Sequence, residues 1–165
     1  MSYFEYFPLV RYNIAGVETL SVNMTSKTNI PQSYKTNGRY YLEYNIQHGE
    51  TPEMIADRFY DSSSLSWIIL MFNDIVNYFD EWPVDYETVI EFTKSKYEDV
   101  NGINHYISAS TGTEVSIDWP TYDKVPITNI EHEQNVNEAK RFIKVPVPDI
   151  ISEIINQHND LISRV

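Results

Sequence analysis

The sequence predicts an α+β fold, in which a small strand–helix–helix core carries an N-terminal arm, a β-hairpin and C-terminal helices. Three observations predict it. Residues 40–46 are rich in Tyr and Ile, as strands are. Residues 52–60 place apolar side chains on one helical stripe, and residues 67–72 form an uninterrupted apolar run.

A length of 165 residues suits one compact domain with extensions. We expect an N-terminal arm in residues 1–38 and the core in residues 39–84. A helix and a β-hairpin are expected in residues 85–127, followed by a helix–strand–helix extension in residues 128–165.

The first core helix is predicted by its start signal. His48, Gly49 and Glu50 break the preceding strand, Thr51 stands where an N-cap belongs, and Pro52 occupies the first helical position. The apolar stripe that follows consists of Met54, Ile55, Ala56, Phe59 and Tyr60.

The second core helix is predicted from six consecutive apolar residues, Trp67 to Phe72. A helix that is apolar all round is buried on most of its sides. A strand is the alternative, because periodicity alone does not settle a short apolar run. The serines at 62–64 and the Asn73-Asp74 pair favour the helix.

These segments resemble the LysM module, which has a Gly-Asp/Glu-Thr turn, a helix with Ile-Ala and Phe, and an Asn after the second helix. The matching residues here are Gly49, Glu50, Thr51, Ile55, Ala56, Phe59 and Asn73.

The chain is more narrowly similar to the wedge subunit of tailed-phage baseplates that carries a LysM-like domain. That family shows a Trp-led apolar helix, an Asn-Asp-Ile, an aromatic loop with Asp-x-Trp-Pro, and a helix ending in Lys-Tyr. These features fall here on Trp67, Asn73, Asp74, Ile75, Tyr78, Phe79, Asp80, Trp82, Pro83, Lys96 and Tyr97. With the pattern of residues 137–151, the resemblance spans about residues 40–155.

The resemblance implies a structural subunit of the inner baseplate wedge of a phage with a contractile tail. Such a subunit joins wedge proteins and neighbouring wedges during assembly, with no catalytic residue, metal or cofactor. Its expected partners are other wedge proteins and hub-proximal tail proteins, in a hetero-oligomer with six copies per baseplate. The expected location is the virion tail, after assembly in the host cytoplasm.

Apolar side chains in the extensions are the expected partner interface. They are Tyr3, Phe4, Tyr6 and Phe7 in the arm, Phe142, Ile143 and Val145 in a short strand, and Ile150, Ile151, Ile154 and Ile155 in the last helix. Pro146 and Pro148 restrict the strand to a sheet edge or an isolated segment. The alternative for the arm and the last helix is docking onto the chain's own core.

Two other functions fit parts of the pattern. A glycan-binding LysM module acting at the host cell wall would use a groove near Glu50, Tyr78 and Trp82. The usual second LysM strand is not visible after Asn73, where Trp82-Pro83 stands instead, and this argues against sugar binding. A cell-wall hydrolase would need an acid–base pair from Asp80, Glu81 and Asp85.

The net charge of −12 repels nucleic acid and anionic membranes, so we expect neither as a partner. There is no cysteine, and the longest apolar run is far shorter than the roughly 18 residues that span a membrane. Glu131, His132 and Glu133 do not share a helix face, which disfavours a zinc site.

Three further elements are expected. Asp85 caps a helix to about Tyr97, and residues 103–119 form a hairpin with a turn at residues 110–113. Thr128 and Glu131 form a capping box, and the polar helix that they start is expected to be a spacer or an exposed connector.

Overall fold

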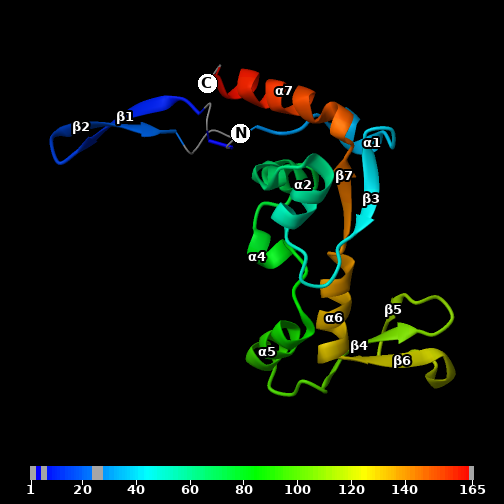
Figure 1. The fold of residues 1–165 in the computed structure, drawn as a ribbon. Coiled ribbons are helices and arrows are strands. Elements are labelled where there is room, and N and C mark those ends of the chain that lie inside the picture. Colours follow the sequence, from blue (N-terminus) through cyan, green and yellow to red (C-terminus); the bar gives the residue numbers. More distant parts are fainter. Residues whose placement is uncertain (1–2, 5–6, 24–27, 164–165) are drawn as a thin grey trace. The chain divides into compact units, whose positions relative to one another are not determined.

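The computed structural model describes residues 3–4, 7–23 and 28–163, which fold as a mixed α+β protein, as predicted (Figure 1). They form two compact units. The core unit comprises residues 1–45, 50–81 and 143–165, and the inserted unit comprises residues 46–49 and 82–142. The sequence analysis divided the chain into four consecutive segments, whereas these compact units combine separate stretches of the chain. The division into four segments stays a prediction.

The core unit contains both chain-terminal regions. Its elements are β1 (Leu9–Ile14), β2 (Val17–Val22), α1 (Gln32–Thr36), β3 (Tyr41–Asn45), α2 (Pro52–Tyr60), α3 (Ser66–Phe72), α4 (Tyr78–Glu81), β7 (Phe142–Pro146) and α7 (Ile151–Ser163). Single 3-10 turns at Ser63–Leu65 and Pro148–Ile150 precede α3 and α7.

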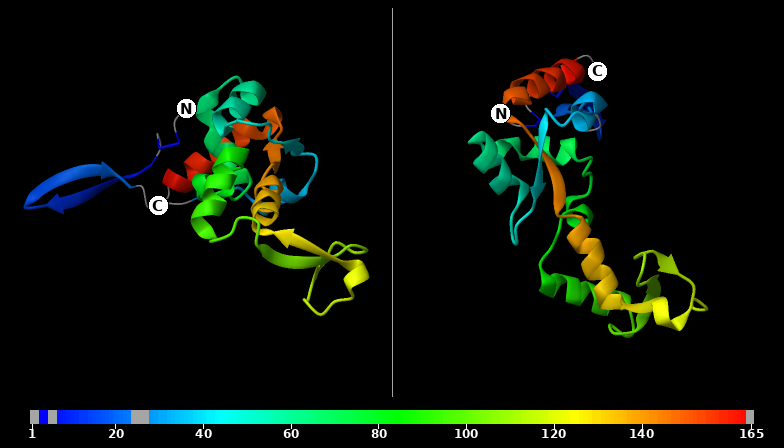
Figure 2. Two further views of the ribbon diagram at one scale, coloured as in Figure 1. Left: turned by 90° about the horizontal axis from the view of Figure 1, so that it is seen from below. Right: turned by 90° about the vertical axis from the view of Figure 1, so that its right-hand side faces the viewer.

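Strands β3 and β7 pair in a two-stranded sheet and lie side by side in Figure 1 and in the right-hand view of Figure 2. Val147 N donates to Tyr40 O over 3.0 Å, and Ile46 N donates to Arg141 O over 2.9 Å. Because the partners run in opposite order along the chain, the strands are antiparallel. Each strand of a two-stranded sheet is an edge, which accommodates the prolines that end β7.

Helix α2 begins as predicted. Thr51 Oγ1 accepts a hydrogen bond from Met54 N over 3.4 Å, and Pro52 occupies the first turn. The helix ends at Asp61, whose φ of 52° is left-handed. The local signals at both ends therefore fix the length of this helix.

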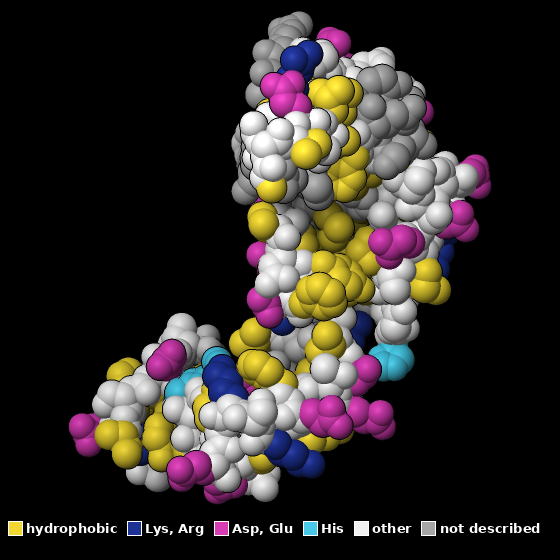
Figure 3. All heavy atoms as spheres, turned by 90° about the vertical axis from the view of Figure 1, so that its left-hand side faces the viewer, with side chains coloured by type: hydrophobic (Ala, Val, Ile, Leu, Met, Phe, Trp, Pro, Cys, Tyr) yellow, Lys and Arg dark blue, Asp and Glu magenta, His cyan; other side chains and the backbone are white. Residues whose placement is uncertain are grey.

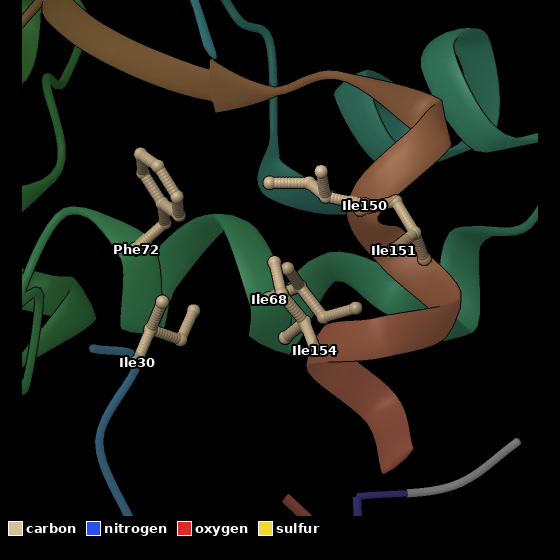
Figure 4. Packing of buried hydrophobic residues seen from close by; sticks show 6 residues of the cluster. All are labelled: Ile30, Ile68, Phe72, Ile150, Ile151 and Ile154. Carbon is tan, nitrogen blue, oxygen red and sulfur yellow. The ribbon is translucent and has the colours of Figure 1, made fainter. Parts of the chain in front are cut away.

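The apolar run in α3 is a helix and not a strand, and it supplies the centre of the core. Ile68, Ile69 and Phe72 are buried. Figure 4 shows Ile68 and Phe72 packed with residues from the segment before α1, the turn before α7 and α7 itself: Ile30, Ile150, Ile151 and Ile154. Burying each such side chain stabilises the fold by roughly 1.5–3 kcal/mol.

Asn73 fastens the end of α3 to β7. Its Nδ2 donates to Ile69 O and to Lys144 O, each over 2.8 Å, and its Oδ1 accepts from Lys144 N over 2.8 Å. One side chain thus completes the helix terminus and satisfies both backbone groups of a strand residue 71 positions away.

The inserted unit contains α5 (Tyr86–Lys96), β4 (Ile103–Ser108), β5 (Glu114–Val115), β6 (Lys124–Thr128) and α6 (Asn129–Ala139), with a 3-10 turn at Thr121–Asp123. Asp85 caps α5 by accepting from Thr88 N over 2.8 Å. The capping box of Thr128 and Glu131 is present at the start of α6. Both helix starts are confirmed.

Helix α6 is polar but is not simply exposed. Glu133 is buried and accepts from Lys96 Nζ over 2.7 Å and from Tyr97 OH over 2.8 Å. Asn137 is buried and bonds both backbone groups of Val84, each over 2.9 Å. The expectation of a spacer or exposed connector therefore missed a helix that packs through hydrogen bonds.

The predicted hairpin of residues 103–119 is present in part: its second strand is limited to Glu114–Val115, and residues 116–119 are not in a strand. Strand β4 pairs with the two-residue β5 on one side and with β6 on the other, in the order β5-β4-β6. The sequence prediction missed β6 because Pro126 interrupts it. Pro126 lies opposite Tyr106 on an edge strand, where the missing N–H is tolerated.

Within the described part of the chain, the helices are too short or too polar to cross a lipid bilayer.

Candidate partner interfaces

The N-terminal aromatic residues pack largely onto the chain itself. The Tyr3 ring lies 5.4 Å from Trp67 and 5.0 Å from His158, between ring centroids, and Phe7 is buried. Burial among these rings lowers the pKa of His158. Phe4 remains 44% exposed, and Tyr6 lies outside the described residues. Among Tyr3, Phe4 and Phe7, Phe4 is thus the most exposed.

The predicted interface residues of β7 alternate between a buried and an exposed side of the strand. Ile143 and Val145 are buried within the chain, whereas Phe142 is 75% exposed. In the turn before α7 and in α7, Ile150, Ile151 and Ile154 are buried and Ile155 is half-buried. Their contact with the chain's own core accounts for most of this apolar character, and Phe142 and Ile155 remain available to a partner.

The residues assigned to the glycan groove do not form an open platform. Glu50 is buried and accepts from Arg58 Nη2 over 2.5 Å and from Tyr44 OH over 2.8 Å. Burial and the neighbouring Glu50 raise the pKa of Tyr44. Trp82 is buried and Tyr78 is half-buried in the short helix α4. Trp82, buried within the chain, leaves no open face for a sugar to stack on.

Acidic and histidine side chains show structural contacts. Burial opposes ionisation of Glu133, but its bonds to Lys96 and Tyr97 hold its pKa below the usual range. The rings of His105 and His132 meet edge to face with centroids 5.4 Å apart. Among the described residues, no three His, Asp or Glu side chains are grouped as metal ligands are.

An apolar groove of about 540 Å³ lies beside α3 in the core unit. Its walls include Tyr3, Trp67, Leu70, Met71 and Val76. The groove adjoins the N-terminal aromatic contacts and is one candidate docking surface of this unit.

The β1–β2 hairpin is an exposed element with apolar side chains. Cross-strand partners share a face, so one face carries Leu9, Arg11, Leu20 and Val22. The other face carries Val10, Tyr12 and Val17. The exposed fractions of Leu9, Val17 and Leu20 are 62–64%, and that of Tyr12 is 43%.

Local chemistry explains why the hairpin forms. Ala15 and Gly16 have φ values of 51° and 86°, as the two central residues of a type I′ turn require. Asn13 Oδ1 accepts a hydrogen bond from Gly16 N over 2.9 Å. Six cross-strand pairs continue from this turn, ending with Leu9 opposite Val22. Figure 2 shows the two strands as one continuous ribbon.

A second exposed surface is the end of the inserted unit's sheet, which we call the aromatic tip and define as Ile117, Asp118, Trp119 and Tyr122. The three large side chains are 66%, 43% and 92% exposed in the order Ile117, Trp119, Tyr122. Asp118 is also exposed.

Asp123 holds the loop that carries the aromatic tip. Its carboxylate accepts from Trp119 Nε1 over 2.9 Å, from Ser108 Oγ over 2.7 Å and from Ser110 N over 2.8 Å. These bonds, led by that from Trp119, lower the pKa of Asp123 to about 2. The carboxylate therefore stays charged and keeps the loop closed at neutral pH.

Acidic side chains are scattered over the face shown in Figure 3, with exposed hydrophobic side chains between them. Against 24 acidic residues the chain has 12 basic ones, and the five ion pairs found among the described residues engage Arg11, Lys35, Arg58, Lys96 and Arg141. The combination suits contact with other proteins better than contact with phosphate.

Comparison with known protein families gives a match to the family described as base plate wedge protein 53, over residues 3–123. The match covers well over half of the chain and includes the hairpin, the core helices and the aromatic tip. A search of curated proteins found no match to the chain.

Proposed function

Because the chain belongs to the phage base plate wedge protein 53 family, we propose that its β1–β2 hairpin is a principal contact by which it is built into the wedge. The protein is a structural, non-enzymatic component of the baseplate in the virion tail. It assembles there with other baseplate proteins. The single observation that carries the proposal is the exposed apolar content of both hairpin faces.

The hairpin has little to stabilise it alone. A two-stranded hairpin is at best marginally stable in water, and a protein seldom exposes apolar side chains on both faces of a sheet without a purpose. The ion pair between Arg11 and Glu18 across the hairpin, at 3.8 Å, is highly exposed and contributes little. A partner surface that covers one or both faces supplies the missing burial.

The hairpin also offers backbone groups. Each of its strands has one edge that is not paired within the two-stranded sheet. Such an edge pairs with a strand of another protein, and the exposed side chains then fill pockets on alternate sides. We propose this combination of strand pairing and apolar burial as the mode of contact.

We further propose that β3, α2, α3 and β7 form a LysM-like block that carries these contacts. The order strand–helix–helix–strand supports this, since the strand missing after Asn73 in the sequence is supplied by β7. Asn73 itself bonds both backbone groups of Lys144 in that strand. The inserted unit then occupies the connection between the second helix and the closing strand.

The proposed partners are other wedge proteins and hub-proximal tail proteins, with six copies per baseplate joining subunits and neighbouring wedges. Beside the hairpin, we propose Phe4, Phe142 and Ile155 as contact residues, because they stay at least partly exposed. The buried residues Phe7, Ile143, Val145, Ile150, Ile151 and Ile154 support these surfaces from beneath.

The test removes apolar side chains from each hairpin face in the intact chain. We expect Leu9→Ser with Leu20→Ser, and separately Tyr12→Ser with Val17→Ser, to weaken incorporation into wedges reconstituted with the other wedge proteins. An interface residue that matters costs about 1–2 kcal/mol, so each pair should weaken binding by roughly tenfold or more.

The matched control is Leu42→Ser, which changes a residue of β3 that is 49% exposed. It should assemble normally, and circular dichroism should show unchanged folding in all variants. Normal incorporation of both hairpin variants would overturn the proposal.

A further inference from the structure

We propose that the aromatic tip binds an arginine-bearing segment of another baseplate protein. The tip lies in the inserted unit and is a different surface from the hairpin. The proposal rests on the protein's place in the baseplate but not on the role proposed for the hairpin.

The first argument is the kind of side chain exposed. Tyr122 is 92% exposed and Trp119 is 43% exposed, and Ile117 beside them is 66% exposed. Tyr and Trp dominate the energy of protein interfaces because they bring large, rigid areas at low entropic cost. Two such side chains and an exposed isoleucine lie within six residues of the chain.

The second argument is that the loop is held ready for contact. Asp123 fixes the Trp119 indole and the Ser110 backbone, and Asp123 N donates to Pro120 O over 3.0 Å. Lys124 Nζ donates to Ile117 O at the other side of the loop. A loop ordered before binding loses less entropy on association.

The third argument is charge. Among the described residues, neither Asp118 nor Glu114 takes part in an ion pair, and both are exposed. The nearest cation in sequence, Lys124, is engaged with Ile117 O and lies 4.9 Å from the Tyr106 ring centroid. The tip therefore carries two exposed aromatic side chains and, next to Trp119 in the chain, the exposed carboxylate of Asp118 outside these ion pairs, a combination that complements a cation.

Arginine fits this surface better than lysine. A guanidinium group stacks flat on Trp or Tyr and at the same time donates two parallel hydrogen bonds to a carboxylate such as Asp118. It also sheds its hydration more readily than an ammonium group. We therefore assign an arginine rather than merely a basic residue to the partner.

The first experiment titrates the intact, isotope-labelled chain with a tetra-arginine peptide and, separately, with a tetra-lysine peptide of equal charge. The indole N–H signal of Trp119, assigned with Trp119→Phe, should shift with tetra-arginine and respond about threefold more weakly to tetra-lysine. Equal responses, or no shift of this signal, would overturn the assignment of arginine.

The second experiment measures incorporation into reconstituted wedges. The double variant Trp119→Ala with Tyr122→Ala, and the charge reversal Asp118→Lys, should each weaken incorporation by about tenfold or more. The control Tyr86→Ala changes a residue of α5 that is 58% exposed and should assemble normally. Unchanged incorporation of both tip variants into wedges would refute the proposal.

The two proposals fail separately. If the hairpin variants assemble normally while the tip variants do not, the hairpin proposal is wrong and the tip proposal stands. A hairpin variant should also retain the full response of Trp119 to tetra-arginine, because the tip belongs to the other unit. Loss of that response would show that the peptide reports on the hairpin and not on the tip.

Discussion

Each of the two units of this protein is stabilised internally by a different kind of interaction. The core unit buries a cluster of isoleucines around Phe72, drawn from four segments of the chain. In the inserted unit, the buried side chains are mostly polar: Thr93, Ser108, Asn129, Glu133 and Asn137. Among its described residues, the buried hydrophobic side chains are Ile46, Trp82 and Val89.

The difference shows which interactions stabilise each unit. Apolar burial is non-directional, so the core unit tolerates small displacements but not the loss of volume. Buried hydrogen bonds are directional and costly to leave unmade, so the inserted unit depends on individual partners. The aromatic tip is the extreme case, because one carboxylate, that of Asp123, bonds Trp119, Ser108 and Ser110.

The largest expected effect is in the core unit. Ile154→Ala should lower the free energy of unfolding by about 2–5 kcal/mol, because it leaves a cavity in the isoleucine cluster. Leu161→Ala, on the same helix at 44% exposure, is the control and should cost less than about 1 kcal/mol. Urea unfolding measures both.

Hydrogen exchange on the same Ile154→Ala variant sharpens the comparison. Amides of α3 should exchange faster while amides of α5 and α6 keep their protection. An equal loss of protection in α6 would mean that the two units unfold as one, against the contrast drawn between them.

A smaller effect is expected in the inserted unit. Asn137→Ala removes the partner of both Val84 backbone groups and should cost about 1–3 kcal/mol, through unmade hydrogen bonds rather than lost volume. Asn135→Ala, on the exposed side of α6, is the control. A cost for Asn137→Ala no greater than that of the control would contradict the polar account of this unit.

The smallest effect is local and depends on pH. The pKa of Asp123 is lowered from 3.8 to about 2, so its stabilising bonds are complete above about pH 4 and are lost as the pH falls towards 2. The indole N–H signal of Trp119 should report this opening of the loop. Asp123→Asn should remove the titration, and a wild-type signal constant down to pH 2 would refute the prediction.

Sequence reasoning predicted the elements whose signals are local. Thr51, Asp85 and Thr128 each bond a backbone N–H three residues onward, so their effect is visible in a short window of sequence. The same holds for the apolar run of α3, whose helical state its flanking residues indicated.

Elements that depend on distant partners were missed. The first strand of the hairpin has apolar residues on both faces and therefore lacks the alternation by which a strand is recognised. Strand β6 contains Pro126 and is stable because it lies at a sheet edge beside β4. Asn73 bonds a residue 71 positions away, which no local pattern reveals.

For a similar reason, the sequence alone does not distinguish interface residues from core residues. Apolar residues such as Ile150, Ile151 and Ile154 give the same sequence pattern whether they face the chain's own core or a partner. Composition therefore does not separate core residues from interface residues. The aromatic tip had a visible signal in Trp119 and Tyr122, but their exposure follows from the bonds of Asp123, which only the structure reveals.

The pairing of β3 with β7 has a consequence for synthesis of the protein on the ribosome. The core unit needs residues 143–163 for its second strand and for half of its isoleucine cluster, whereas the inserted unit is complete at residue 142. During translation the inserted unit is therefore free to fold first. Until residues 143–163 are synthesised, the apolar side chains of α2 and α3 lack part of their packing partners and stay exposed to solvent. Nascent chains of this protein should accordingly be most prone to aggregation just before β7 emerges.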